Sequence, residues 1–142
     1  MTAAATALVL AMLVQITWTF IVMLRTGRAR FAAIKTGRVG KAAALDSQAW
    51  PDDVRKHGNN MNNQFETPTL FYALVLLAVV LGMADAVLAV LAWVFVASRV
   101  VHTVIHTGSN VVSRRFRVFL IGTGSLMLMT GWIAVRVVMT AL

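Results

Sequence analysis

Residues 67–98 read TPTLFYALVLLAVVLGMADAVLAVLAWVFVAS, and Asp85 is the single charged residue among them. The segment Gly82–Asp85 interrupts two apolar runs with a composition typical of a tight turn. A helix needs about 20 predominantly apolar residues to cross the hydrocarbon of a bilayer. The first run can gain length from the residues before it and the second continues past Arg99. This stretch therefore predicts a hairpin of two membrane-spanning helices.

Two further apolar runs flank this hairpin. Thr2–Leu24 contains no charge, and a basic segment follows it where a signal peptide would have a small-residue cleavage site. The last run, Val118–Val135, ends at Arg136, while Pro51 followed by two aspartates has the composition of a helix start. We expect an all-α integral membrane four-helix bundle with up-and-down topology, in one domain of residues 1–142. The expected helices are about 2–26, 51–83, 86–108 and 115–141, with a loop at about 27–50.

The composition supports this class. Hydrophobic residues make up 59% of the chain and charged residues 13%, whereas soluble domains average about 45–50% and about 25%. The chain has no cysteine, which excludes disulfides, thiolate metal ligands and a cysteine nucleophile. Any thiol chemistry must therefore be supplied by a ligand.

The basic residues lie on one side of the predicted membrane. Twelve of the 13 fall in or beside the first and third loops, and Arg136 alone falls on the other side. This bias predicts that loops 1 and 3 are cytoplasmic in a multi-pass protein. The net charge of +8 is therefore a topology signal. A bacterial inner membrane is the expected location, from the family resemblance given below. Nucleic-acid binding is not expected, because the basic and aromatic residues do not form an interleaved platform.

The first polar cluster is RKHGNNMNNQFETP, residues 55–68. On one helix, Asn59, Asn63 and Glu66 would share a face, which Arg55 extends by a turn. Such a face can hold a zwitterionic, amide-rich ligand, with Glu66 taking an ammonium and Arg55 a carboxylate. The alternative is interhelical polar packing with Glu66 neutralised by an arginine. Pro68 removes a backbone hydrogen bond and is expected to kink this helix.

The second polar cluster lies at the end of the third predicted helix. Arg99, His102 and His106 share a face, which Asn110 would continue if the helix did. The two histidines have no third ligand at metal-binding spacing, so no metal site is predicted. We expect Arg99 to pair with Glu66 across the bundle. Cations at the membrane surface follow, with lipid headgroups as an alternative use: Arg114, Arg115 and Arg117.

These two clusters resemble the MAPEG family, the membrane-associated proteins in eicosanoid and glutathione metabolism. The segment Asn63-Gln64-Phe65-Glu66 is similar to the family's Asn-x-x-Glu pair. The pattern Arg99-x-x-His102-Thr103, followed by Arg115, Phe119 and Gly122, is similar to the microsomal glutathione transferase branch. The resemblance covers nearly the whole chain, including its length, its four helices and its tight second loop.

The resemblance implies a homotrimer that holds glutathione, as co-substrate, between neighbouring subunits near the cytoplasmic face. Asn63 and Glu66 would bind the tripeptide backbone, and Arg115 would stabilise the thiolate. An arginine of the adjoining subunit, Arg28 or Arg30, would bind a glutathione carboxylate. The other candidate ligand-binding residues are Asn59, Arg55, Arg99 and His102. The family's catalytic aromatic hydroxyl is replaced by His106, which could donate to the thiolate in its place.

Two functions remain open at this stage. The first is a membrane-bound glutathione transferase or peroxidase that acts on hydrophobic electrophiles, which would enter from the lipid. The second is a non-catalytic protein on the MAPEG scaffold that binds lipid or serves as an accessory subunit of a membrane complex. The replacement of the expected tyrosine by His106 motivates the second function.

Overall fold

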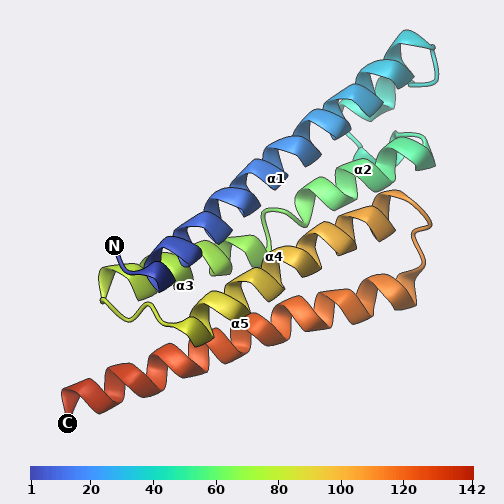
Figure 1. Cartoon of the computed structure of the whole chain (residues 1–142). Helices are drawn as coiled ribbons and strands as arrows, with labels where there is room; N and C mark the ends of the chain where they lie inside the picture. The colour runs from blue at the N-terminus through green and yellow to red at the C-terminus, as the bar shows by residue number, and fades with distance from the viewer.

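A computed structural model describes all residues, 1–142, as an all-α bundle. Its elements are α1 (Ala3–Lys35), η1 (Lys41–Ala44), η2 (Ser47–Ala49), α2 (Asp52–Asn62), α3 (Thr67–Val80), α4 (Ala86–Thr107) and α5 (Val112–Ala141). The long segments alternate in direction along the bundle (Figure 1). Four segments are long and apolar enough to cross a membrane, with α2 and α3 together forming the second. The prediction of a four-helix integral membrane bundle is confirmed.

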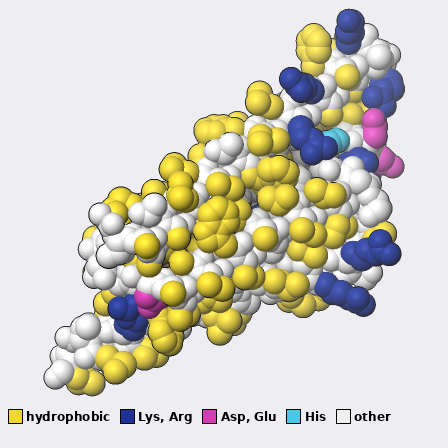
Figure 2. Space-filling view, viewed as in Figure 1, with side chains coloured by type: hydrophobic (Ala, Val, Ile, Leu, Met, Phe, Trp, Pro, Cys, Tyr) yellow, Lys and Arg dark blue, Asp and Glu magenta, His cyan; other side chains and the backbone are white.

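The two ends of the bundle differ in composition. One end carries both chain termini and the turn between α3 and α4, and we call it the turn end (Figure 1). The other end carries loops 36–51 and 108–111, and we call it the basic end because most Lys and Arg side chains gather there (Figure 2). The surface between the ends is largely apolar on the face shown. Only 31 of 142 residues are buried, so lipid or other subunits must cover much of this surface.

Helix α4 is the central element, packed against α1, α2 and α5. Its Phe95 stacks on Phe71 of α3, with ring centroids 4.6 Å apart, inside a core of buried apolar side chains. Gly122 of α5 lies against Ser98 of α4, where an added Cβ would collide with the Ser98 hydroxyl. A glycine at this position therefore allows α4 and α5 to approach closely.

The second span is broken rather than continuous over 51–83. Helix α2 ends at Asn62 and α3 begins at Thr67, and Glu66 between them has φ −89° and ψ −97°, outside the helical region. Pro68 explains the break, because it offers no N–H to the Gln64 carbonyl and its ring would clash with that carbonyl in a continuous helix, whereas proline fits the first turn of α3. The expected kink is therefore a full interruption. The single helical face through Asn59, Asn63 and Glu66 does not exist.

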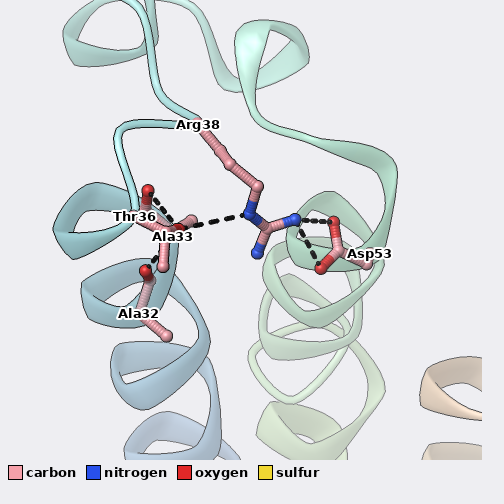
Figure 3. A network of polar contacts seen from close by, with 5 residues as sticks. All are labelled: Ala32, Ala33, Thr36, Arg38 and Asp53. Atoms are coloured by element: carbon pink, nitrogen blue, oxygen red, sulfur yellow. Dashed lines mark hydrogen bonds and ion pairs between the residues drawn. The ribbon is translucent and has the colours of Figure 1, made fainter.

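The first helix is longer than expected, and the first loop is correspondingly shorter. Helix α1 continues to Lys35, where Gly37 at φ +69° lets the chain leave the helix. Arg28 and Arg30 therefore lie on a helix rather than in the loop. In the loop, Arg38 donates two hydrogen bonds to Asp53 of α2, at 3.2 and 3.1 Å (Figure 3). Both side chains are about half exposed, so this pair adds little stability.

At the turn end, Asp85 connects three parts of the chain. One carboxylate oxygen accepts the Leu88 N–H at 2.9 Å and caps α4. The other accepts from the Trp132 indole at 2.8 Å and the Arg136 guanidinium at 2.7 Å. Arg136 also donates to the Met83 carbonyl at 2.6 Å. Burial alone would raise the pKa of Asp85, but these donors together hold the pKa below its ordinary value of 3.8.

Candidate functional site

A cavity of about 200 Å³ opens at the basic end, between the α2–α3 break, α4 and the first turns of α5. Its lining comprises Asn63, His102, Val112, Arg115, Phe116 and Phe119. Three of the residues singled out in the sequence, Asn63, His102 and Arg115, thus come together from three separate elements. No carboxylate lines the cavity, so its polar groups are a cation, an imidazole and an amide.

Asn63 is held in place from two directions. Its side-chain amide donates to the Asn59 carbonyl at 2.9 Å, which caps the end of α2. Its own carbonyl accepts from Nη2 of Arg99 at 2.7 Å. Arg99 is buried, and its Nε has no partner in the chain. The arginine therefore fixes the backbone at the break.

The expected ion pair between Arg99 and Glu66 is wrong for the isolated chain. Glu66 forms no ion pair, and its side chain is exposed. The break between α2 and α3 is the physical reason, because Glu66 lies in it rather than on a helical face directed at α4. Arg99 takes a backbone carbonyl as its partner instead.

The two predicted histidines occupy different positions relative to the cavity. Both are buried on α4, with an edge-to-face arrangement and ring centroids 5.5 Å apart. His102 lines the cavity, whereas His106 is not among the lining residues. In each, Nδ1 is buried without a hydrogen-bond partner. The direct thiolate contact expected of His106 is thus available to His102 in this chain.

Arg115 enters the cavity from α5 and is positioned by the preceding loop. Its Nη1 donates to the Asn110 side-chain oxygen at 2.9 Å. Asn110 follows the end of α4 and has φ +51°, so it does not continue the helical face of Arg99 as expected. Asparagine tolerates this left-handed conformation better than most residues. The remaining guanidinium nitrogens are free to meet an anionic ligand.

Other candidates lie outside the cavity of their own chain. Arg55 pairs with Asp52 at 2.6 Å and donates to the Gln48 carbonyl at 3.2 Å, near the start of α2. Asn59 and Glu66 are exposed, and neither lines the cavity. The ligand-binding face expected from these residues is therefore not assembled within one chain.

The candidate arginines of α1 also lie away from the cavity. Arg30 stacks over the Trp50 ring, with its guanidinium carbon 5.3 Å from the ring centroid. Arg28 is exposed and makes no hydrogen bond or ion pair in the chain. A contact between either arginine and a ligand in this cavity would have to come from a neighbouring subunit.

One group of buried polar residues was not predicted from the sequence. Gln15 of α1, Gln64 in the break and Thr103 of α4 are each almost completely buried, and Gln64 is hydrogen-bonded to both of the others. Gln15 is a glutamine inside the apolar run Thr2–Leu24, which is the signal that could have revealed the group. Its partner could not have been identified from spacing, because 49 residues separate Gln15 from Gln64.

Comparisons with known proteins give one result. A family model described as the MAPEG family matches residues 8–135. No curated protein matches the chain, and no solved structure does. The matched range contains α2–α4 entirely, most of α1 and α5, and every residue that lines the cavity.

Proposed function

The chain belongs to the MAPEG family, and from this premise we propose that it binds glutathione at the basic end and transfers it to hydrophobic electrophiles. The observation that carries this proposal is the convergence of Arg115, His102 and Asn63 on a cavity without carboxylates. A cation attracts a carboxylate or thiolate, and an amide can pair with a peptide group. Glutathione presents all of these groups.

The chemistry suits a transferase. A free thiol has a pKa near 8.5, and a nearby cation lowers it, so that more of the bound glutathione is thiolate at neutral pH. Arg115 supplies that cation, and the His102 imidazole, whose Nε2 makes no hydrogen bond in the chain, can donate a hydrogen bond to the sulfur. The thiolate then forms a bond to the electrophilic carbon, and the leaving group departs with its electron pair. The apolar wall of Val112, Phe116 and Phe119 fits a hydrophobic acceptor that enters from lipid.

We propose a homotrimer, as in the family, because the site of one chain is too small. Ligand pockets usually measure about 300–1,000 Å³, whereas this cavity has about 200 Å³. A neighbouring subunit would enlarge it and bring Arg28 or Arg30 to a glutathione carboxylate. The same contact would cover the exposed Asn59 and Glu66 and direct them at the peptide backbone of the ligand.

The charge distribution supports a cytoplasmic basic end. Twelve of 13 basic residues lie in or towards the loops of this end, in accordance with the positive-inside rule. In a bacterial inner membrane the cavity would then face the compartment that holds reduced glutathione. Labelling of single cysteines introduced at Gly40 and at Ala141 by a membrane-impermeant reagent tests this orientation, because only Ala141→Cys should react in intact cells.

A non-catalytic role on the same scaffold is favoured by one observation. No Ser, Thr or Tyr hydroxyl lines the cavity, so the usual hydroxyl partner of the thiolate is absent. In that case the protein would bind lipid or serve as an accessory subunit. Glutathione-dependent conjugation of a chlorinated nitrobenzene by the purified protein would exclude this alternative, whereas copurification of a stoichiometric partner would support it.

Calorimetry of the detergent-purified protein tests the proposed function most directly. We expect saturable heat on titration with glutathione and none with glycine, which has one ammonium and one carboxylate but lacks the second carboxylate, the peptide groups and the thiol of the tripeptide. The absence of binding at millimolar glutathione would refute the proposal. The oligomeric state should be measured on the same sample by light scattering with detergent correction.

A further inference from the structure

Gln64 follows the cavity residue Asn63 directly and lies inside the bundle, with 1% of its surface exposed. Its carbonyl oxygen accepts from the Gln15 amide of α1 at 3.3 Å. Its own amide donates to the Thr103 hydroxyl of α4 and to the Asn60 carbonyl of α2, each at 3.3 Å. One side chain therefore joins three helices at the point where the second span is interrupted.

Thr103 connects this group to a second side chain of α1. Its hydroxyl oxygen also accepts from the Trp18 indole at 3.3 Å. The bonds lie within the membrane-spanning bundle, where an unpaired amide is costly and a paired one is hard to break. Two positions of α1 are thus fixed to α4 and to the break through Gln64 and Thr103. We call Gln15, Gln64 and Thr103 the amide clamp.

The amide clamp acts where the backbone has lost its helical support. The break still has turn-type bonds, from the Gln64 N–H to Met61 and from the Phe65 N–H to Asn62, each 2.9 Å long. No continuous helix restrains Asn63 or Glu66. The bond from Arg99 holds the Asn63 carbonyl, and the clamp holds the next residue.

We propose that Gln64, together with Gln15 and Thr103, is a positioning residue that keeps Asn63 directed at the ligand cavity. Gln64 anchors the break inside the bundle, and Asn63 lines the cavity. The inference rests on the proposed function in one respect, because the ligand that Asn63 meets is taken to be glutathione. A role as simple interhelical packing is the competing interpretation, and it predicts an effect on stability alone.

The double variant Gln15→Leu/Gln64→Leu separates these interpretations. Replacing both partners of a buried hydrogen bond by apolar groups is often neutral for stability, but this variant also removes the donor to the Asn60 carbonyl, so the melting temperature should fall only slightly. Hydrogen exchange of the Gln64 and Phe65 amides, read by mass spectrometry, should accelerate by about tenfold or more. The KM for glutathione should rise about tenfold while kcat at saturating glutathione stays near that of the wild type.

Two variants of Thr103 test the same proposal if the double variant does not fold. Thr103→Val keeps the shape of the side chain and removes the acceptor of Gln64, whereas Thr103→Ser retains the hydroxyl. We expect faster exchange and a higher KM in the first and near-normal values in the second. Ser125→Ala is the matched control, because this buried hydroxyl bonds only within α5, to the Gly122 carbonyl at 2.7 Å.

The outcomes distinguish failure of the clamp from failure of the proposed function. Unchanged exchange at Gln64 and Phe65 in a folded clamp variant overturns the proposal, whatever happens to the melting temperature. Unchanged KM with accelerated exchange also overturns it, because Asn63 would then not depend on the clamp. A wild-type protein that does not bind glutathione refutes the proposed function, and exchange in the variants still decides whether the clamp holds the break.

Discussion

The two ends of the bundle contain similar polar groups but use them differently. At the turn end, Asp85 accepts three hydrogen bonds, and Arg136 has both a carboxylate and a carbonyl as partners. At the basic end, Nε of Arg99 and Nδ1 of both His102 and His106 are buried without a partner. The polar side chains at the turn end all have hydrogen-bond partners within the chain, whereas several at the basic end do not.

This difference suggests that polar residues at the turn end stabilise the fold and that those at the basic end bind a ligand. Of the three residues with unpartnered atoms, only His102 lines the cavity, and the groups open to a ligand there are those of Arg115, His102 and Asn63. The proposed glutathione site adds a ligand and a neighbouring subunit to these groups. Changes at the turn end should therefore affect stability, and changes at the basic end should affect binding and rate.

The largest effect is expected from Arg115→Gln. Loss of the cation that stabilises the thiolate should lower kcat/KM for conjugation by about 10²–10³, which corresponds to about 2.7–4 kcal/mol. The melting temperature should change little, because Arg115 has only the exposed Asn110 as a partner in the chain. Arg114→Gln is the matched control, since this neighbouring residue does not line the cavity. Equal losses in both variants would mean that general surface charge, rather than Arg115, carries the effect.

Asp85→Ala should have the next largest effect, at the other end of the bundle. It removes the cap of α4 and leaves Trp132 and Arg136 without their carboxylate, so we expect a loss of about 2–3 kcal/mol. Scanning fluorimetry in detergent should report a lower melting temperature. Trp132→Phe, which removes one bond, should lose about 1 kcal/mol. The KM for glutathione should stay unchanged, and a raised KM would show that the ends are coupled.

The sequence predicted the turn end better than the basic end, for a physical reason. Asp85 was recognised because one charge between two apolar runs can only lie in a turn at the membrane surface. Arg136 was identified as the exception to the charge bias, but its bond to Asp85 depends on how α5 packs, which spacing along one helix does not reveal. Local chemistry was sufficient to place the start of α4 at Ala86, whereas α3 ends at Val80, three residues before the expected end.

At the basic end, contacts between residues far apart in the sequence determine the arrangement of the site, and the sequence predicted only part of it. The positions of Asn63, His102 and Arg115 were anticipated from motifs, and the structure brings them to one cavity. The sequence predicts only a kink at Pro68, whereas the structure has a full interruption at residues 63–66. A kinked but continuous helix would have directed Glu66 at Arg99. The partnership of Gln15 with Gln64 could not be derived without the fold.

Gly122→Ala should destabilise the protein less than Asp85→Ala does, and it tests the close contact of α4 and α5 between the two ends. Its added Cβ meets the Ser98 hydroxyl, so α4 and α5 must separate slightly, at a cost of about 1–2 kcal/mol. The double variant Gly122→Ala/Ser98→Ala removes the obstruction and should recover the wild-type melting temperature. If the double variant is as unstable as the single one, contact with Ser98 is not the reason for the glycine.

The smallest expected effect is the loss of stability at the turn end when acid protonates Asp85. The pKa of Asp85 is below 3.8 in the folded chain, so its ion pair contributes fully above pH 3.8 and is lost as the pH falls through the lower folded value. The side chains are partly exposed, at 29% for Asp85 and 34% for Arg136, which limits the contribution to less than about 1 kcal/mol. The difference in melting temperature between the wild type and Asp85→Asn isolates this carboxyl from the others. That difference should be constant from pH 7 to about pH 4 and narrow only below it. If the difference in melting temperature disappeared between pH 7 and pH 5, burial would raise the pKa of Asp85 more than its hydrogen-bond donors lower it. The donors at the turn end would then not satisfy this carboxylate.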